Sequence, residues 1–486
     1  MNQSEQAPEQ ALATRTLRGM AWAYGAFGGG RAVVLVSTAI LARLLTPREF
    51  GVVALALVFM TFLESLNELG LGQALIVAAV DEEAERAQTV FSWSVVLGLA
   101  LTITMAACSS PIAGFFHQPQ LAGLLPVLGL NFFLRALGAT HYALARKQLN
   151  YRVRTVSEIS EVVVRGGVSI GLALAGAGVW SLVIGFVAGV LASTTALWLQ
   201  VDFRPRLALT RTHLRDMVQF GGALTLVDVG SVIIANTDYL FIGRILGASS
   251  LGLYSIGFRI PELAILNVAH VAADVLFPAY SALDPQRLRD GYLKSLRYLT
   301  MLTMPLAAGV VALARPMILV VFGHQWTGSI PVARAIAGYT LFATLSIPPG
   351  TVLKVTRRIP LMIAFAIPLL LALIGLLVIF TNQGIVAVAL ATSVLQTTVA
   401  PLQIFIVSRQ LKLSPLSSVR VMTPPLIAAA VMAGALIALQ QVIGPPVLEL
   451  IVGIPLGGAI YLAVLWSMSR EELIALRTMA FPRSSS

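Results

Sequence analysis

The chain has 486 residues, of which 57% are hydrophobic and 11% are charged, and its mean hydropathy is +0.86. An average soluble domain carries about 25% charged residues, so this composition excludes a soluble enzyme, and a chain this apolar is not disordered. The apolar residues come in stretches of about 20 or more, the length that a helix needs to cross a bilayer. The sequence therefore predicts an all-α polytopic membrane protein.

Fourteen apolar windows lie between charged or Gly/Pro-rich breaks. In chain order they are 20–44, 50–72, 89–109, 121–144, 155–176, 179–199, 217–242, 250–280, 298–322, 328–354, 359–380, 384–408, 420–443 and 447–468. The first window is too long for the core of a signal peptide and is interpreted as an uncleaved span. An even number of spans places both termini on one side of the membrane.

The formal net charge of +11 would raise the question of nucleic acid in a soluble chain, but here it first bears on topology. With the N-terminus inside, 24 Lys and Arg residues fall in the inner segments and three, Arg43, Arg48 and Arg244, in the outer ones. Positive residues in short loops stay cytoplasmic, so both termini are expected in the cytoplasm. Cys108 is the single cysteine. We expect no metal site, no cofactor and no nucleic acid partner.

A repeat with an offset of 201 residues divides the chain. Leu-Ala-Arg-Leu-Leu at 41–45, followed by Phe50-Gly51, matches Ile-Gly-Arg-Ile-Leu at 242–246, followed by Leu251-Gly252. Chance similarity between apolar segments is the alternative. Two copies of six helices predict two pseudo-symmetric lobes with the substrate between them near mid-membrane. The expected parts are an N-terminal tail (1–19), an N-lobe (20–200), a C-lobe (201–412), two added helices (413–468) and a C-terminal tail (469–486).

Charged side chains inside a bilayer are costly and usually mark function. Six arginines fall within predicted spans: Arg31, Arg135, Arg165, Arg259, Arg315 and Arg334. Because the arginine fork binds phosphate oxygens bidentately, these six residues are candidates for binding an anionic, phosphate-bearing substrate. Asp228 and Glu262 are the clearest deep acids and are candidates for ion coupling.

Structural explanations compete with these roles. Glu161 and Arg165 are spaced i,i+4, and Arg259 and Glu262 are spaced i,i+3, so each pair could be joined within one helix without a ligand. The other four arginines have no partner in their own helix. For them, contact with a ligand or cavity is favoured over a cross-helix salt bridge.

The sequence resembles the polysaccharide-transporter (Wzx-like) branch of the MOP flippase superfamily. The likeness runs from Gly19 through AILARLLTPREFG at 39–51 to ELGLGQALI at 68–76. It continues in the second half with FIGR at 241–244, LGLY at 251–254, and Phe322-Gly323 followed by Trp326.

The resemblance implies a V-shaped, MATE-like pair of six-helix lobes plus two C-terminal helices. It also implies a flippase, not an enzyme, that moves a polyprenyl-pyrophosphate-linked oligosaccharide across a bacterial inner membrane by alternating access. The lipid bilayer, a polysaccharide polymerase and export machinery would be its partners.

Three alternatives come from other classes. A lipid II-type flippase would share the cationic cavity. A multidrug/cation antiporter of the same superfamily would need a dominant acidic pocket, whereas arginines here outnumber deep acids. A membrane-embedded polymerase or glycosyltransferase would need a large loop bearing acids or a nucleophile, and the sequence has none.

Overall fold

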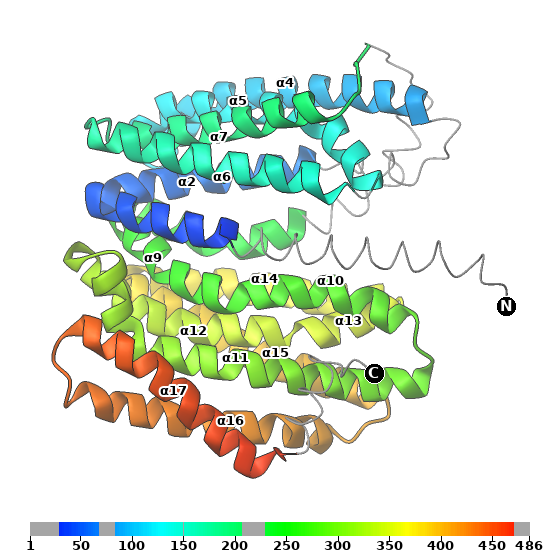
Figure 1. The fold of residues 1–486 in the computed structure, drawn as a ribbon, viewed down its shortest axis with the longest axis vertical. Coiled ribbons are helices and arrows are strands. Elements are labelled where there is room, and N and C mark those ends of the chain that lie inside the picture. The colour runs from blue at the N-terminus through cyan, green and yellow to red at the C-terminus, as the bar shows by residue number, and fades with distance from the viewer. Residues whose placement is uncertain (1–28, 68–82, 149, 207–228, 471–486) are drawn as a thin grey trace, which may run out of the picture. The chain divides into compact units, whose positions relative to one another are not determined.

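The structure, a computed structural model, describes residues 29–67, 83–148, 150–206 and 229–470 (Figure 1). The first part of this range is helical over residues 29–44, α2 (Pro47–Asn67), α4 (Glu83–Phe115), α5 (Gln120–Lys147), α6 (Tyr151–Leu174), α7 (Val179–Gln200) and residues 229–245. The second part contains α9 (Gly247–Pro261), the π-helical turn η2 (Glu262–Leu266), α10 (Asn267–Ser281), α11 (Pro285–Val321), the 3-10 turn η3 (His324–Ser329), α12 (Ile330–Leu345), α13 (Ile347–Val355), α14 (Ile359–Phe380), the 3-10 turn η4 (Thr381–Gln383), α15 (Ile385–Gln410), α16 (Pro415–Gln440) and α17 (Pro446–Met468). No strand occurs in these ranges.

Each of the fourteen predicted spans overlaps a helical segment of the described residues. Ten of the described helical segments are long and apolar enough to cross a membrane. The all-helical membrane architecture is therefore confirmed, while the number of crossings and the side of the termini stay predictions.

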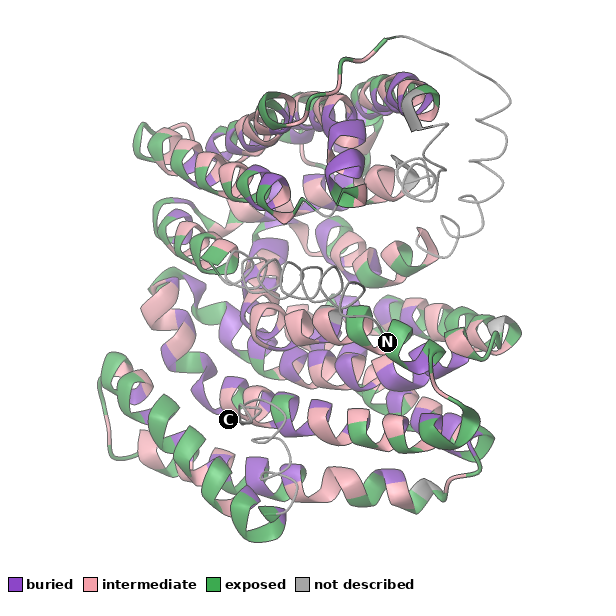
Figure 2. Ribbon diagram, turned by 45° about the vertical axis from the view of Figure 1, so that its right-hand side comes forward, coloured by how far each residue is buried: buried purple, intermediate pink, exposed green. Residues whose placement is uncertain are grey.

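The surface of the helices agrees with a lipid environment. Exposed residues occur along most of the described helices (Figure 2). Large apolar ones among them include Ile103, Leu199, Leu371 and Val394. Extensive exposed apolar surface is rare in soluble monomers and marks contact with lipid or a partner.

The described contacts divide the chain into two units, residues 1–252 and 253–486. The helical segment 229–245 thus lies in the first unit by its contacts, while the boundary between the lobes at residue 200 stays a prediction. Helices associate through complementary surfaces, and a compact unit therefore does not have to end where a covalent repeat ends.

In the first unit, α5 packs against both α4 and α7, and α7 also packs against α6. Small residues bring these helices close together. A Cβ placed on Gly98 of α4 would lie 2.7 Å from the Phe132 carbonyl oxygen of α5. Close approach at small residues is the usual way in which helices pack in lipid, where apolar side chains alone give little driving force.

The second unit repeats this arrangement. Its helix α12 packs against α11 and α15, as α5 packs against α4 and α7, and the added helices α16 and α17 pack against α11. The helix ends correspond too, because Phe116-His117 follows α4 and Phe322-Gly323 follows α11. The duplication found in the sequence is therefore reproduced in the packing of the described helices.

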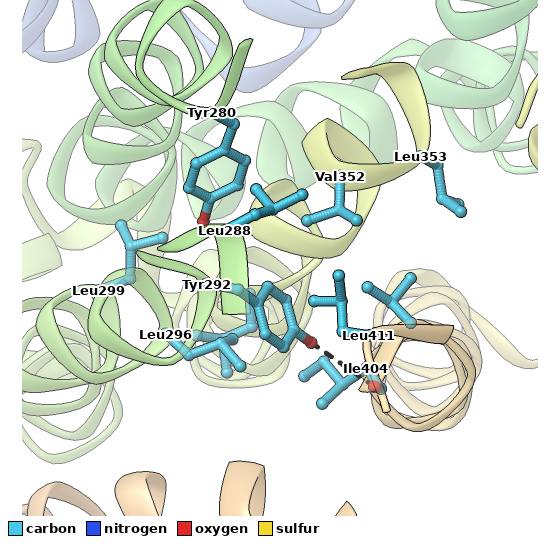
Figure 3. Close-up of a cluster of buried hydrophobic side chains, with 11 residues drawn as sticks. Tyr280, Leu288, Tyr292, Leu296, Leu299, Val352, Leu353, Ile404 and Leu411 are labelled. Atoms are coloured by element: carbon cyan, nitrogen blue, oxygen red, sulfur yellow. Dashed lines mark hydrogen bonds between the residues drawn. The ribbon is translucent and has the colours of Figure 1, made fainter. Parts of the chain in front are cut away.

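Helix α11 is longer than its predicted span of 298–322, because it begins at Pro285. Asp284 caps it by accepting hydrogen bonds from the backbone N–H groups of Gln286 and Arg287. One face of the added turns is buried in a cluster with Tyr280 of α10, with α12, with α13 and with α15 (Figure 3). In this cluster, the Tyr292 hydroxyl donates to the Ile404 carbonyl oxygen at 3.5 Å.

Candidate functional site

A charge cluster links three helices of the first unit near the middle of α5. Arg135 of α5 donates from Nη2 to Glu161 Oε1 of α6 at 2.7 Å, and its Nε lies 3.5 Å from Glu64 Oε1 of α2. At 1.5 Å per residue, Arg135 lies about 22 Å from the start of α5 and about 18 Å from its end. We call Arg135, Glu64 and Glu161 the Arg135 cluster.

The Arg135 cluster is accessible rather than sealed. The side chains of Arg135, Glu64 and Glu161 are 38%, 43% and 20% exposed. A guanidinium has five N–H donors, and the two carboxylates leave room for further acceptors. The Arg135 guanidinium is therefore only partly enclosed by its two carboxylate partners.

Glycines of α7 fix the position of α6 beside this cluster. A Cβ placed on Gly189 would lie 2.7 Å from the Glu161 carbonyl oxygen and 2.8 Å from Arg165 Cβ, and one on Gly185 would lie 1.9 Å from Ser169 Oγ. The two backbones can approach this closely only because these α7 residues lack a side chain.

Arg165 lies on the same helix as Glu161, one turn further on. Its guanidinium carbon is 3.3 Å from the centre of the Phe186 ring, in cation–π geometry. The described contacts thus join Glu161 to Arg135 on another helix, whereas the sequence offered Arg165 as its partner within one helix. When all four groups are ionised, the charges of Arg135, Arg165, Glu64 and Glu161 cancel.

In the second unit, Arg259 pairs with Glu262 at 3.0 Å, which confirms that i,i+3 pair. Glu262 opens the π-helical turn η2, directly after Pro261. Single π-helical turns inside α-helices are rare and are frequent at functional sites.

Arg315 of α11 reaches Glu449 of α17, with 3.5 Å between Nη1 and Oε1. The Glu449 side chain is only 2% exposed, and its Oε2 has no hydrogen-bond partner. Arg334 on α12 is exposed, and no ion pair or hydrogen bond joins its side chain to another described residue. Arg315 therefore has a structural partner, while Arg334 is available.

Two candidate site residues remain, Arg31 and Asp228. Arg31 is exposed in the helical segment 29–44, and Asp228 lies outside the described residues. The pairing of Glu64 with Arg135 and the burial of Glu449 are not evident in the sequence. Cross-helix partners have no spacing signal, so neither contact was readable from the sequence.

The helices and their pairing define a multi-pass helical membrane protein with buried and half-buried charge pairs. The sequence profile described as "Polysaccharide biosynthesis protein" matches residues 40–331. The chain therefore belongs to this family of polysaccharide biosynthesis proteins.

Named relatives agree with this assignment. The chain is 28% identical to the succinoglycan biosynthesis transport protein ExoT of Rhizobium meliloti (strain 1021) over 66% of this chain and 65% of ExoT, just under two thirds of that relative. It is 25% identical to the teichuronic acid biosynthesis protein TuaB of Bacillus subtilis (strain 168), over 67% of this chain and 68% of TuaB. It is 24% identical to the lipopolysaccharide biosynthesis protein WzxC of Escherichia coli (strain K12), over 73% of each chain.

Solved structures share the fold at lower sequence identity. The lipid II flippase MurJ, in an inward closed conformation, superposes with a TM-score of 0.77 at 17% identity, over 93% of this chain and 99% of MurJ. An inward-facing multidrug resistance MATE family transporter of the MOP superfamily gives a TM-score of 0.65 at 17% identity, over 79% of this chain and 94% of the transporter. The fold is therefore that of the MOP superfamily transporters.

Proposed function

We propose that this protein flips a polyprenyl-pyrophosphate-linked oligosaccharide across the bacterial inner membrane for the assembly of a surface polysaccharide. The Arg135 cluster carries the proposal, because its half-exposed guanidinium lies near the middle of helix α5 in a MOP-type fold. Membership of the polysaccharide biosynthesis family supports the substrate class. Polysaccharide polymerase and export machinery would act on the product.

The chemistry of the cluster suggests an exchange of anions. Without substrate, Arg135 is held by Glu161 and Glu64. A pyrophosphate offers oxygens in the planar arrangement that a guanidinium binds bidentately, so it can take the place of one carboxylate. The lipid tail would stay in the bilayer while the head group crosses by alternating access.

The other candidate site residues are assigned to head-group contact or to ion coupling. Arg334 is exposed on its helix and is free to contact the head group. Arg31, Arg165, Arg259 and Arg315 are proposed as further head-group contacts. Asp228 and Glu262 are proposed as sites of ion coupling.

The experiment is complementation of a strain that lacks this gene. Arg135→Ala should lower polysaccharide export about 10- to 100-fold, because a charge-assisted hydrogen bond contributes about 1.5–3 kcal/mol. Arg31→Ala should also lower export. Arg135→Lys should restore part of it, since lysine keeps the charge but not the fork.

Arg154→Ala is the matched control, because Arg154 pairs with Glu158 on its own helix at 3.9 Å. It removes an arginine from the same unit and should leave export unchanged. Full export in both Arg135→Ala and Arg31→Ala, with the protein present in the membrane, would overturn the proposal.

A lipid II-type flippase is the second candidate, and the fold similarity to MurJ favours it. Depletion of the host's own lipid II flippase distinguishes the two. We expect no rescue of growth by this protein. A multidrug/cation antiporter is disfavoured because Glu161 and Glu262 are both neutralised by arginines.

A further inference from the structure

A pocket outside the charge clusters lies at one end of the first unit. It has a volume of about 440 Å³, within the range of pockets that hold small molecules. The beginnings of α2, α5 and α7 surround it, at the end that the distribution of Lys and Arg predicts to be outside. We call it the Trp180 pocket.

One wall of the Trp180 pocket is flat and apolar. Trp180, in the first turn of α7, is 39% exposed. Its ring atoms Cζ2 and Cη2 lie 3.6 and 3.8 Å from the position that a Cβ would take on Gly123 of α5. A side chain at position 123 would therefore contact the edge of the indole ring, and glycine has none.

The facing wall holds a fixed carboxylate. Glu49 Oε2 accepts hydrogen bonds from the backbone N–H of Thr46 at 2.7 Å and from its hydroxyl at 2.8 Å, as in a capping box. The other oxygen, Oε1, lies 2.6 Å from where a Cβ on Gly178 would stand. Gly178 has φ 55° and ψ −131°, a conformation that favours glycine, and because it has no side chain the Glu49 carboxylate fits against its backbone.

The charges around the Trp180 pocket disfavour both cationic and anionic ligands. The N-terminal ends of α5 and α7 meet there, and their partial positive charge disfavours a cation. The Glu49 carboxylate disfavours an anion. A neutral molecule with many hydroxyl groups suits this lining, because its hydroxyls can donate to the Glu49 carboxylate while its C–H groups pack against the indole.

We propose that the Trp180 pocket binds a neutral sugar ring of the transported head group on the outer side. This rests on the proposed function, and it adds a second contact, separate from the Arg135 cluster, that recognises sugar rather than phosphate. Such a contact would hold the oligosaccharide after it has crossed.

The test is equilibrium binding to the purified full-length protein. The probe is the soluble repeat-unit oligosaccharide released from the host's surface polysaccharide, which carries neither lipid nor pyrophosphate. We expect saturable binding that weakens at least tenfold in Trp180→Leu and in Gly123→Leu, which fills the space beside the indole. Glu49→Gln keeps an oxygen for the Thr46 cap but loses the charge, and it should also weaken binding.

Trp466→Leu is the control, since Trp466 is another exposed tryptophan, on α17, and does not line the pocket. It should bind like the unmodified protein. Absence of saturable binding to the unmodified protein, or equal binding by Trp180→Leu and Gly123→Leu in folded form, overturns the inference. Arg135→Ala separates the two proposals, because it should stop export and still bind the soluble oligosaccharide.

Discussion

Gly51 of α2 and Gly252 of α9 lie backbone against backbone, at equivalent positions of the repeat. A Cβ on Gly51 would stand 1.7 Å from the Ala248 carbonyl oxygen, and a Cβ on Gly252 would stand 1.8 Å from the Pro47 carbonyl oxygen. Ala248 and Pro47 are also equivalent residues of the repeat. All four residues belong to the first unit, so this contact joins equivalent positions of the repeat within that unit.

This contact predicts that Gly51→Ala and Gly252→Ala destabilise the protein strongly. The obstructing atoms are backbone atoms that cannot turn aside, and overpacking typically costs about 1–3 kcal/mol or more. The thermal midpoint and the yield of monodisperse protein in detergent would measure the loss. Gly375→Ala in α14 is the control, because a Cβ there meets nothing within 4 Å. An unchanged midpoint in Gly51→Ala would contradict the contact.

The Arg135 cluster predicts non-additive effects on stability. Arg135→Ala leaves the Glu161 carboxylate without its 2.7 Å partner, so it should destabilise more than the double variant Arg135→Ala/Glu161→Ala. Contacting residues typically show interaction energies of about 0.5–3 kcal/mol. A double-mutant cycle on the free energy of unfolding measures this coupling. Simple additivity would show that the ion pair contributes nothing to the folded state.

The Arg315–Glu449 pair predicts an asymmetry between its two members. Removing Arg315 leaves a buried carboxylate unpaired, which costs about 1–3 kcal/mol, whereas Glu449→Gln removes the buried charge itself. Arg315→Ala should therefore lower the thermal midpoint more than Glu449→Gln. Arg334→Ala is the control for stability and should change the free energy of unfolding by no more than about 0.5 kcal/mol. The opposite order for Arg315→Ala and Glu449→Gln would show that the pair is not structural.

The residues that follow α15 and α6 predict opposite effects of substitution on the thermal midpoint. After α15, Lys412 has φ 54°, its N–H donates to the Arg409 carbonyl, and the Leu413 N–H donates to Ser408, as in a Schellman motif. After α6, Gly176 occupies the same position with φ 81°. A non-glycine residue in this conformation costs about 1 kcal/mol or more.

Lys412→Gly should therefore raise the thermal midpoint, and Gly176→Ala should lower it. A Cβ on Gly176 meets nothing within 4 Å, so only the backbone conformation is tested there. A fall in the midpoint for Lys412→Gly would mean that the lysine side chain stabilises this end of α15 by more than its backbone conformation costs.

The helices were predictable because the bilayer imposes a length and an apolar composition that a single sequence displays. The added turns of α11 were missed because a hydropathy window detects only wholly apolar segments. A helical signal was nevertheless present, since Leu288, Tyr292, Leu296 and Leu299 follow one another at intervals of four, four and three.

The candidate site was only partly predictable. The arginines could be found because a charge in an apolar window is conspicuous. Their partners depend on which helices meet, so Arg135 with Glu161 and Arg315 with Glu449 follow from tertiary packing alone. Arg259 with Glu262 was readable because both residues lie on one helical face.

The length of helix α11 provides a position for a spectroscopic probe outside the lipid. Its 37 residues span about 55 Å, against about 30 Å of hydrocarbon, so part of it must stand clear of the lipid. The cluster around Tyr292 ties that part to the neighbouring helices of the second unit. A spectroscopic probe attached at the exposed Asp290 would report the orientation of the second unit, and Asp290 is not among the proposed substrate contacts.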